Sequence, residues 1–204
     1  MSRISESDER AKIPEAVLVR PVFGVGLSPG TLAGQIVSER TLFVFLRHFG
    51  CIFCREAIAD IRAAKEADPD YPDVLFFFQG SATEGRAFLR RYWPEARAVA
   101  DPELELYDAF GVGRATLLEA LGPQVLKANR RAKSKGHSSG PRSGDIWRMP
   151  GIFAVENLHI VWSHSPSHAA DHPDFTRLRD VFSPATRAGS MTSERAANPG
   201  DVIS

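Results

Sequence analysis

The two cysteines of this chain stand three residues apart, as Cys51 and Cys54, and they are the residues whose type and spacing most directly suggest chemistry. A Cys-x-x-Cys pair can cycle between two thiols and an internal disulfide, or it can contribute two ligands to a metal ion. Redox cycling requires one sulfur to be a thiolate near neutral pH, because the thiolate is the nucleophile. The first question is therefore which elements hold the pair.

A buried strand and a helix are predicted on either side of the cysteines. Residues 41–46 form a β-branched and aromatic run, and residues 54–67 carry apolar side chains at helical spacing. The pair then lies on the first turn of a helix, where unpaired N–H groups and the positive end of the macrodipole favour a thiolate at Cys51. We expect its pKa to fall from about 8.5 into a range of roughly 3.5 to 7.5. The same spacing brings Cys54 back toward Cys51, so that a disulfide can close.

The overall charge gives no indication of a nucleic-acid or membrane partner. The 204 residues include 25 basic and 25 acidic side chains, which cancel. The first twelve residues are charged rather than apolar, and no apolar run approaches the ~20 residues of a membrane span. We therefore expect a soluble, cytoplasmic protein. In a reducing cytosol a close cysteine pair is typical of redox catalysis or metal binding rather than of a structural disulfide.

The remaining pattern predicts one α/β domain over residues 13–184, between disordered tails at 1–12 and 185–204. The apolar run 74–78 predicts a central strand covered on both faces. Further strands are expected at 98–100, 151–155 and 159–163, the last two as an antiparallel hairpin. Further helices are expected at 82–93, from 101 or 102 to 111, at 115–129 with a break at Gly122 and Pro123, and at 172–182. A mobile basic loop is expected at about 127–145.

Three stretches together resemble a known superfamily. They are residues 45–55 around the cysteines, the Asp-Pro-Glu-Leu segment with the residues that follow it at 101–112, and Pro-Gly-Ile-Phe-Ala-Val at 150–155. This arrangement resembles the peroxiredoxin-like branch of the alkyl hydroperoxide reductase and thiol-specific antioxidant superfamily. The resemblance implies a thioredoxin-like fold, in which a central mixed sheet is flanked by helices and ends in an antiparallel C-terminal hairpin.

The same resemblance implies roles for individual residues. Cys51 or Cys54 would be the attacking thiolate, and the two would form an intramolecular disulfide during turnover. Pro150 would be a cis proline that faces the pair and presents backbone to the substrate. Arg148 is the nearest match to an arginine that holds the thiolate and the peroxide, while Arg47 and Arg55 are rival sources of positive charge. The expected partners are a peroxide or disulfide substrate and a thioredoxin- or glutaredoxin-type reductant, with no cofactor.

The sequence leaves the order of attack and the substrate open. We favour Cys51 as the nucleophile and Cys54 as the resolving residue, because Cys51 lies nearer the first N–H groups of the helix. The superfamily pattern Pro-x-x-x-Thr-x-x-Cys matches neither cysteine: it would place Arg47 and Cys51, or Val44 and His48, at the proline and threonine positions. Thiol chemistry is therefore better supported than peroxide reduction.

Two alternatives assign the cysteines no redox role. They could be small buried apolar residues, or they could hold zinc together with His164 and His168. In either case the chain would be a non-catalytic thioredoxin-fold module whose basic loop binds a partner. The sequence gives no oligomeric state.

Overall fold

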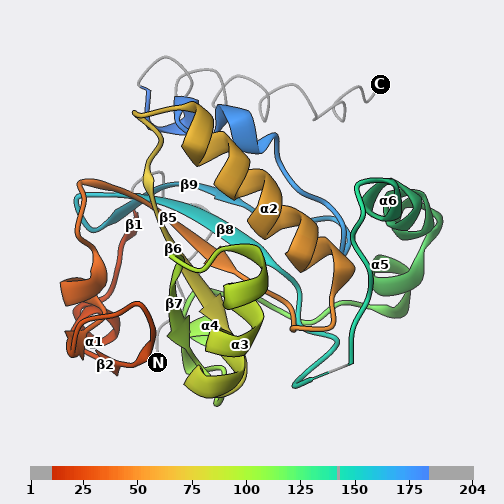
Figure 1. Cartoon of the computed structure of the whole chain (residues 1–204). Coiled ribbons are helices and arrows are strands. Elements are labelled where there is room, and N and C mark those ends of the chain that lie inside the picture. The colour runs from red at the N-terminus through yellow and green to blue at the C-terminus, as the bar shows by residue number, and fades with distance from the viewer. Residues whose placement is uncertain (1–10, 142, 184–204) are drawn as a thin grey trace, which may run out of the picture.

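A mixed β-sheet with helices on both faces forms the centre of the molecule in the computed structural model, which describes residues 11–141 and 143–183 (Figure 1). Within the described part, the sheet has seven strands in the order β1-β9-β8-β5-β6-β7-β3. The pairs β5–β6 and β6–β7 are parallel and the other pairs are antiparallel. The predicted mixed sheet flanked by helices is confirmed.

The elements have the following bounds. The main sheet contains β1 (Ala11–Lys12), β3 (Gly24–Val25), β5 (Arg40–Phe45), β6 (Asp73–Phe78), β7 (Arg97–Ala100), β8 (Gly151–Glu156) and β9 (His159–His164), and a separate pair is made by β2 (Pro21–Val22) and β4 (Gly30–Thr31). The α-helices are α1 (Glu15–Leu18), α2 (Ile52–Ala67), α3 (Ala82–Tyr92), α4 (Glu105–Ala109), α5 (Leu117–Leu121) and α6 (Pro123–Ser134). Short 3-10 helices are η1 (Ala33–Gln35), η2 (Phe175–Arg177) and η3 (Asp180–Phe182).

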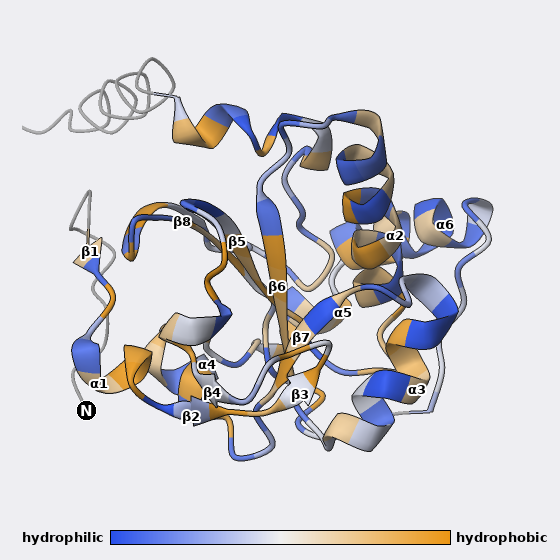
Figure 2. Cartoon of the chain, turned by 60° about the vertical axis from the view of Figure 1, so that its left-hand side comes forward, coloured by the Kyte–Doolittle hydropathy of each residue, from blue (hydrophilic) through white to orange (hydrophobic). Residues whose placement is uncertain are grey.

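The two central strands are apolar on both faces because both faces are covered. In β6, Phe76 and Phe78 belong to the apolar core on the α2 and α3 side, whereas Leu75 and Phe77 belong to the core on the α1 and α4 side. Figure 2 shows this strand as hydrophobic over most of its length. The sequence prediction of a central strand at 74–78 is confirmed, since β6 lies between β5 and β7.

The helix after the cysteines packs its apolar stripe onto this sheet. Ala57, Ile58, Ile61 and Ala64 recur at helical spacing and are buried in α2. The helix begins at Ile52, directly after Cys51, and its N-terminal end lies near the C-terminal end of β5. The strand–turn–helix unit that the sequence predicts is therefore present.

The last two strands are joined by a tight turn. Strands β8 and β9 pair antiparallel, and Asn157 and Leu158 between them have φ angles of 51° and 66°, as residues of a type I′ turn do. Strand β8 also pairs antiparallel with β5, placing Gly151 opposite Phe45. This pairing brings the segment before β8 next to the residues that follow β5.

The structure differs from the sequence expectations in three segments. Ala11 and Lys12, assigned to a tail, pair as β1 with β9, because that edge strand offers free backbone groups; residues 1–10 and 184–204 lie outside the described residues. The expected basic loop at 127–145 is helical as far as Ser134, since α6 buries Val125, Ala128 and Ala132 at helical spacing. The closing helix at 172–182 is replaced by η2 and η3.

The expected break at Gly122 and Pro123 is confirmed, since α5 ends at Leu121 and proline occupies the first position of α6. Within the described ranges, no helix has both the length and the hydrophobicity needed to cross a membrane.

Candidate functional site

Cys51 and Cys54 lie at the N-terminal end of α2, as the sequence predicts. Cys51 is the N-cap residue, with φ −74° and ψ 119°, and its backbone N–H donates to the carbonyl of His48 at 3.0 Å. Cys54 follows within the first turn. Both cysteines are free thiols, and they are 4% and 3% exposed. The pair is thus held in a turn where backbone N–H groups point toward the sulfur of Cys51.

Arg47 joins both sulfurs to the segment that precedes β8. Its Nη1 donates to Cys51 Sγ at 3.7 Å, and its backbone N–H donates to Cys54 Sγ at 3.2 Å. Its Nε donates to the carbonyl of Arg148 at 2.9 Å, and its Nη2 donates to the carbonyl of Ile146 at 2.8 Å. The guanidinium is buried, and these two carbonyls fix its position beside the thiol.

The pKa values of the two cysteines are shifted in opposite directions. A hydrogen bond from Cys54, the charge of Arg47 and the N–H groups of Cys54 and Phe53 lower the pKa of Cys51 to about 6, although burial opposes the shift. Burial and the proximity of Cys51 raise the pKa of Cys54 well above its ordinary value. At neutral pH the pair therefore comprises a thiolate at Cys51 and a thiol at Cys54, which donates to it.

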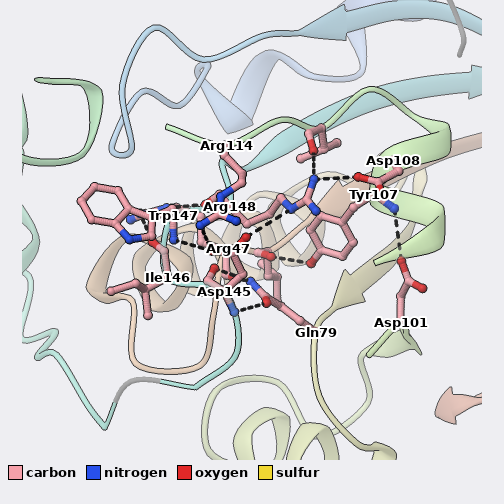
Figure 3. Close-up of polar contacts among 12 residues, drawn as sticks. Arg47, Gln79, Asp101, Tyr107, Asp108, Arg114, Asp145, Ile146, Trp147 and Arg148 are labelled. Carbon is pink, nitrogen blue, oxygen red and sulfur yellow. Dashed lines mark hydrogen bonds and ion pairs between the residues drawn. The ribbon is translucent and has the colours of Figure 1, made fainter. Parts of the chain in front are cut away.

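Gln79 connects three parts of the site (Figure 3). It follows β6 and is 4% exposed. Its Nε2 donates to the carbonyl of Arg47 and, at 2.9 Å, to the carbonyl of Asp145. Its Oε1 accepts from the N–H of Asp145 at 2.6 Å. One buried amide thus joins Arg47, two residues after β5, to the loop before β8.

Tyr107 lies beneath the same strand ends. Its hydroxyl donates to the carbonyl of Leu46 at 2.5 Å and lies 3.0 Å from the carbonyl of Phe77. The backbone N–H of Tyr107 donates to Asp101, whose carboxylate also accepts the N–H groups of Glu105 and Leu106 and so caps α4. Burial raises the pKa of Tyr107, so the hydroxyl remains protonated.

Arg148 acts on the site through its backbone. Its Nη1 donates to Asp108 at 2.9 Å and to the carbonyl of Val112 at 2.7 Å, and its guanidinium lies 5.8 Å from the ring centre of Tyr107. No hydrogen bond or ion pair within the described chain joins this side chain to either sulfur. Of the three arginines that the sequence proposes, Arg47 therefore contacts the Cys51 sulfur directly.

The expected cis proline is wrong, because the Met149–Pro150 bond is trans. The two residues before it pair with another segment: Arg148 pairs with Arg114, and the N–H of Met149 donates to the carbonyl of Gly113 at 2.9 Å. The chain passes through the trans bond from this pairing into β8. Pro150 is buried, and the backbone that reaches Arg47 comes from Ile146 and Arg148 instead.

The hydrogen bonds of Arg55 hold a loop over the cysteine turn. Arg55 donates to the carbonyl of Phe49 at 3.1 and 3.3 Å and to the carbonyl of Ser138 at 2.6 Å. The N–H of Gly140 donates to the carbonyl of Gly50 at 3.0 Å. A Cβ on Gly50 would lie 2.3 Å from the carbonyl oxygen of Pro141, so only glycine allows this close approach.

The histidines proposed as zinc ligands lie in a different local network. His164 Nε2 is 3.5 Å from Asp171 Oδ1, and His168 Nδ1 is 3.2 Å from the N–H of Ala170. Among the described residues, no group of three or more His, Cys, Asp or Glu side chains is arranged to hold a metal ion.

With this geometry in place, the comparison with protein families is informative. The sequence model of AhpC/TSA antioxidant enzymes matches residues 62–168, just over half of the 204 residues. The chain belongs to this family. The protein is accordingly an oxidoreductase. The matched range includes Gln79, Tyr107 and Arg148, and it begins after Arg47 and both cysteines.

Solved structures share the fold at low sequence identity. Xanthomonas campestris peroxiredoxin Q aligns with a TM-score of 0.56 and 14% identity over 91% of this chain and 99% of its own. The bacterioferritin comigratory protein of Xanthomonas campestris aligns with a TM-score of 0.54 and 14% identity over 89% of this chain and 95% of its own. Reduced Prx3 of Vibrio vulnificus aligns with a TM-score of 0.55 and 10% identity over 89% of this chain and 99% of its own. The thioredoxin-like fold is thereby confirmed. No curated protein matches the chain.

Sequence reasoning missed two polar residues of the site. It assigned no role to Gln79 or Asp145, and it used Asp101 and Tyr107 only as part of a resemblance. The signal for Gln79 was its position directly after the predicted strand 74–78. Carboxyl ends of parallel strands meet at one edge of the sheet, which is where the cysteines also lie.

Proposed function

We propose that the protein is a thiol–disulfide oxidoreductase of peroxiredoxin-like type, in which Cys51 attacks a peroxide or a disulfide and Cys54 resolves the product. The observation that carries this proposal is the position of both sulfurs at the start of α2 against Arg47, whose Nη1 donates to Cys51 Sγ and whose backbone N–H donates to Cys54 Sγ. Cys51 has a lowered pKa beside Arg47, whereas Cys54 keeps its proton. A nucleophile and a resolving thiol thus lie within one helical turn.

With a peroxide, the reaction has two steps. The Cys51 thiolate attacks the terminal oxygen, the O–O bond breaks, and the leaving alkoxide takes a proton to form an alcohol, or water from hydrogen peroxide. Cys51 is then a sulfenic acid. The Cys54 sulfur attacks it, an S–S bond forms, and the hydroxyl group leaves with the Cys54 proton as water. An external dithiol must return two electrons and two protons before the next turnover.

Arg47 stabilises the thiolate before attack, and the Ile146 and Arg148 carbonyls hold Arg47 there. In this proposal Arg148 and Gln79 are positioning residues, and Pro150 does not contact the substrate. The names of two structural relatives, one describing alkyl peroxide reduction and one a complex with hydrogen peroxide, support a peroxide as the first substrate to test. The regenerating dithiol is proposed to be of thioredoxin or glutaredoxin type, and the proposed compartment is the cytoplasm.

The test is single-turnover consumption of hydrogen peroxide and of an alkyl hydroperoxide by the reduced full chain, with Cys51→Ser and Cys54→Ser variants. Cys51→Ser should abolish consumption. Cys54→Ser should keep the first turnover and accumulate a sulfenic acid that a dimedone probe traps. Consumption that persists in Cys51→Ser, or a first turnover that is lost only in Cys54→Ser, would contradict the assigned order of attack.

A further inference from the structure

The helices α5 and α6 expose a set of leucines beside the cysteine turn. We define the leucine ridge as Leu117, Leu118, Leu121 and Leu126, whose exposed fractions are 66%, 73%, 63% and 62%. None of the five residues of α5 is buried. Isolated exposed leucines are ordinary, but these four lie within ten residues of sequence on two consecutive helices, and such a concentration of exposed apolar side chains is typical of an interaction surface.

The ridge is held firmly. Thr116 and Glu119 form a capping box at the start of α5. The N–H of Ala115 donates to the carbonyl of Trp147 at 2.7 Å, and the carbonyl of Glu119 accepts the N–H of Ala169 at 2.9 Å. Helix α5 is thus anchored by its neighbours on both sides, while its leucines are exposed to solvent and not packed into the core.

The ridge lies next to the redox site. Helix α6 packs against α2, where Arg131 makes two hydrogen bonds of 2.9 and 3.0 Å with Glu56, two residues after Cys54. At the start of α5, Ala115 bonds Trp147, the residue between the two whose carbonyls hold Arg47. In Figure 1 both helices lie beyond the N-terminal end of α2. A protein seated on the ridge would therefore border the cysteine turn.

The charges around the leucine ridge indicate which kind of partner would bind there. Between Glu119 and Asp145 the chain has six basic residues and no acidic residue. Arg131 and Lys135 are paired with acids of α2, but Lys127, Arg130 and Lys133 are exposed and make no ion pair with any described residue. A second copy docked symmetrically would bring these cations together. The ridge instead fits a partner with an apolar contact surface and an acidic rim.

We propose that the leucine ridge is the docking surface for an acidic dithiol protein that reduces the Cys51–Cys54 disulfide. This inference rests on the proposed function. Both cysteines are almost fully buried, so a protein reductant needs a fixed surface beside the turn to align its own thiol. In the exchange a partner thiolate attacks one sulfur, a mixed disulfide forms, and the other sulfur leaves as a thiolate. The second thiol of the partner then closes the partner's own disulfide, so two electrons and two protons pass to this chain.

The test measures reduction of the full chain after diamide has closed its disulfide, so that it does not depend on activity toward peroxides. The probes are a thioredoxin with its reductase and NADPH, and dithiothreitol as a reductant that needs no docking. The variants are Leu118→Asp with Leu121→Asp, and Arg130→Glu with Lys133→Glu. Val37→Asp is the matched control, because Val37 is 67% exposed and belongs to the N-terminal segment that covers the other face of the sheet.

We expect both double variants to lower the rate constant with thioredoxin by about tenfold or more and to leave the rate with dithiothreitol within about twofold. The loss in the charge variant should shrink at high salt. Thioredoxin rates equal to wild type, or an equal loss with dithiothreitol, would overturn the docking surface. The docking surface would also be overturned if light scattering showed a wild-type dimer that the leucine variants dissociate, because the leucine ridge would then be an interface between two copies of the chain. Failure of peroxide to oxidise the pair would instead refute the proposed function.

Discussion

Replacing Arg47 with methionine tests how the site lowers the pKa of Cys51. The guanidinium Nη1 lies 3.7 Å from the sulfur. A unit charge pair at that distance interacts by about 4 kcal/mol at an effective dielectric constant near 20, which bounds the pKa change at about 3 units. The hydrogen bond from Cys54 remains in the variant and is the largest contribution. We therefore expect the pKa of Cys51 to rise by about 1.5 units.

The sign of the effect on reactivity follows from the thiolate being the reactive form. Alkylation of Cys51 in the wild type should fall as pH decreases through about 6. With Arg47→Met the midpoint moves up, so the rate near pH 6 should drop roughly fifteenfold, while rates near pH 9 converge. Losing two hydrogen bonds from a charged donor to buried carbonyls should also cost about 2–3 kcal/mol of stability.

The assay is iodoacetamide labelling from about pH 4 to about pH 9 in chains that keep Cys54, with peptide mapping to follow the label on Cys51 and circular dichroism to confirm folding. Arg55→Met is the matched control, because Arg55 bonds the carbonyls of Phe49 and Ser138 and neither sulfur. Arg55→Met should raise the maximum rate of Cys51 alkylation, because the loop over the cysteine turn loosens, and should leave the pH midpoint of alkylation unchanged. A midpoint unchanged by Arg47→Met, or moved equally by Arg55→Met, would refute the reasoning.

Three further substitutions have defined outcomes. Gln79→Leu removes the amide that holds Arg47 and Asp145, so it should slow peroxide consumption and raise the alkylation midpoint of Cys51, whereas an unchanged midpoint would exclude a positioning role. Asp101→Ala removes the acceptor of three N–H groups in α4 and should cost about 1–2 kcal/mol in urea unfolding, with a midpoint of Cys51 alkylation close to wild type. Burial raises the pKa of Glu56, but hydrogen bonds from Arg131 and Lys135 outweigh it and lower that pKa. The stabilisation from Glu56 is therefore present above its unfolded pKa and is lost as pH falls through the lowered folded value. Glu56→Gln should unfold more easily at neutral pH, and its deficit should shrink under acid; a constant deficit would contradict the ion pairs as the cause.

Much of the site's position could be predicted from the sequence because local patterns determine it. The apolar runs at 41–46 and 74–78 specify two central strands, and the spacing of Ile58 and Ile61 specifies the helix that follows the cysteines. The preference for Cys51 over Cys54 as the acidic residue agrees in direction with the lowered pKa of Cys51 and the raised pKa of Cys54. The reason was incomplete, because the largest contribution is the hydrogen bond from Cys54 and not the helix terminus.

The long-range contacts could not be predicted from local patterns. Arg47 meets the carbonyls of Ile146 and Arg148 across about a hundred residues of sequence, and Gln79 meets Asp145 by the same folding of the chain. Such pairs depend on strand order, which places β8 beside β5. The backbone pairing of residues 113–115 with 147–149, beside the trans Met149–Pro150 bond, is another contact between distant parts of the sequence. The C-terminal half of helix α6, up to Ser134, was mistaken for a loop because its glycine- and serine-rich continuation masked the buried positions Ala128 and Ala132.

The central claim is that the cysteine pair closes a reversible disulfide when it meets a peroxide. The most direct measurement is the intact mass of the reduced full chain before and after one equivalent of hydrogen peroxide, with peptide mapping of the product. The account predicts the loss of two hydrogen atoms, a crosslink between Cys51 and Cys54, and full return of the original mass with dithiothreitol. An unchanged mass, or stable addition of oxygen to Cys51 in the presence of Cys54, would contradict it.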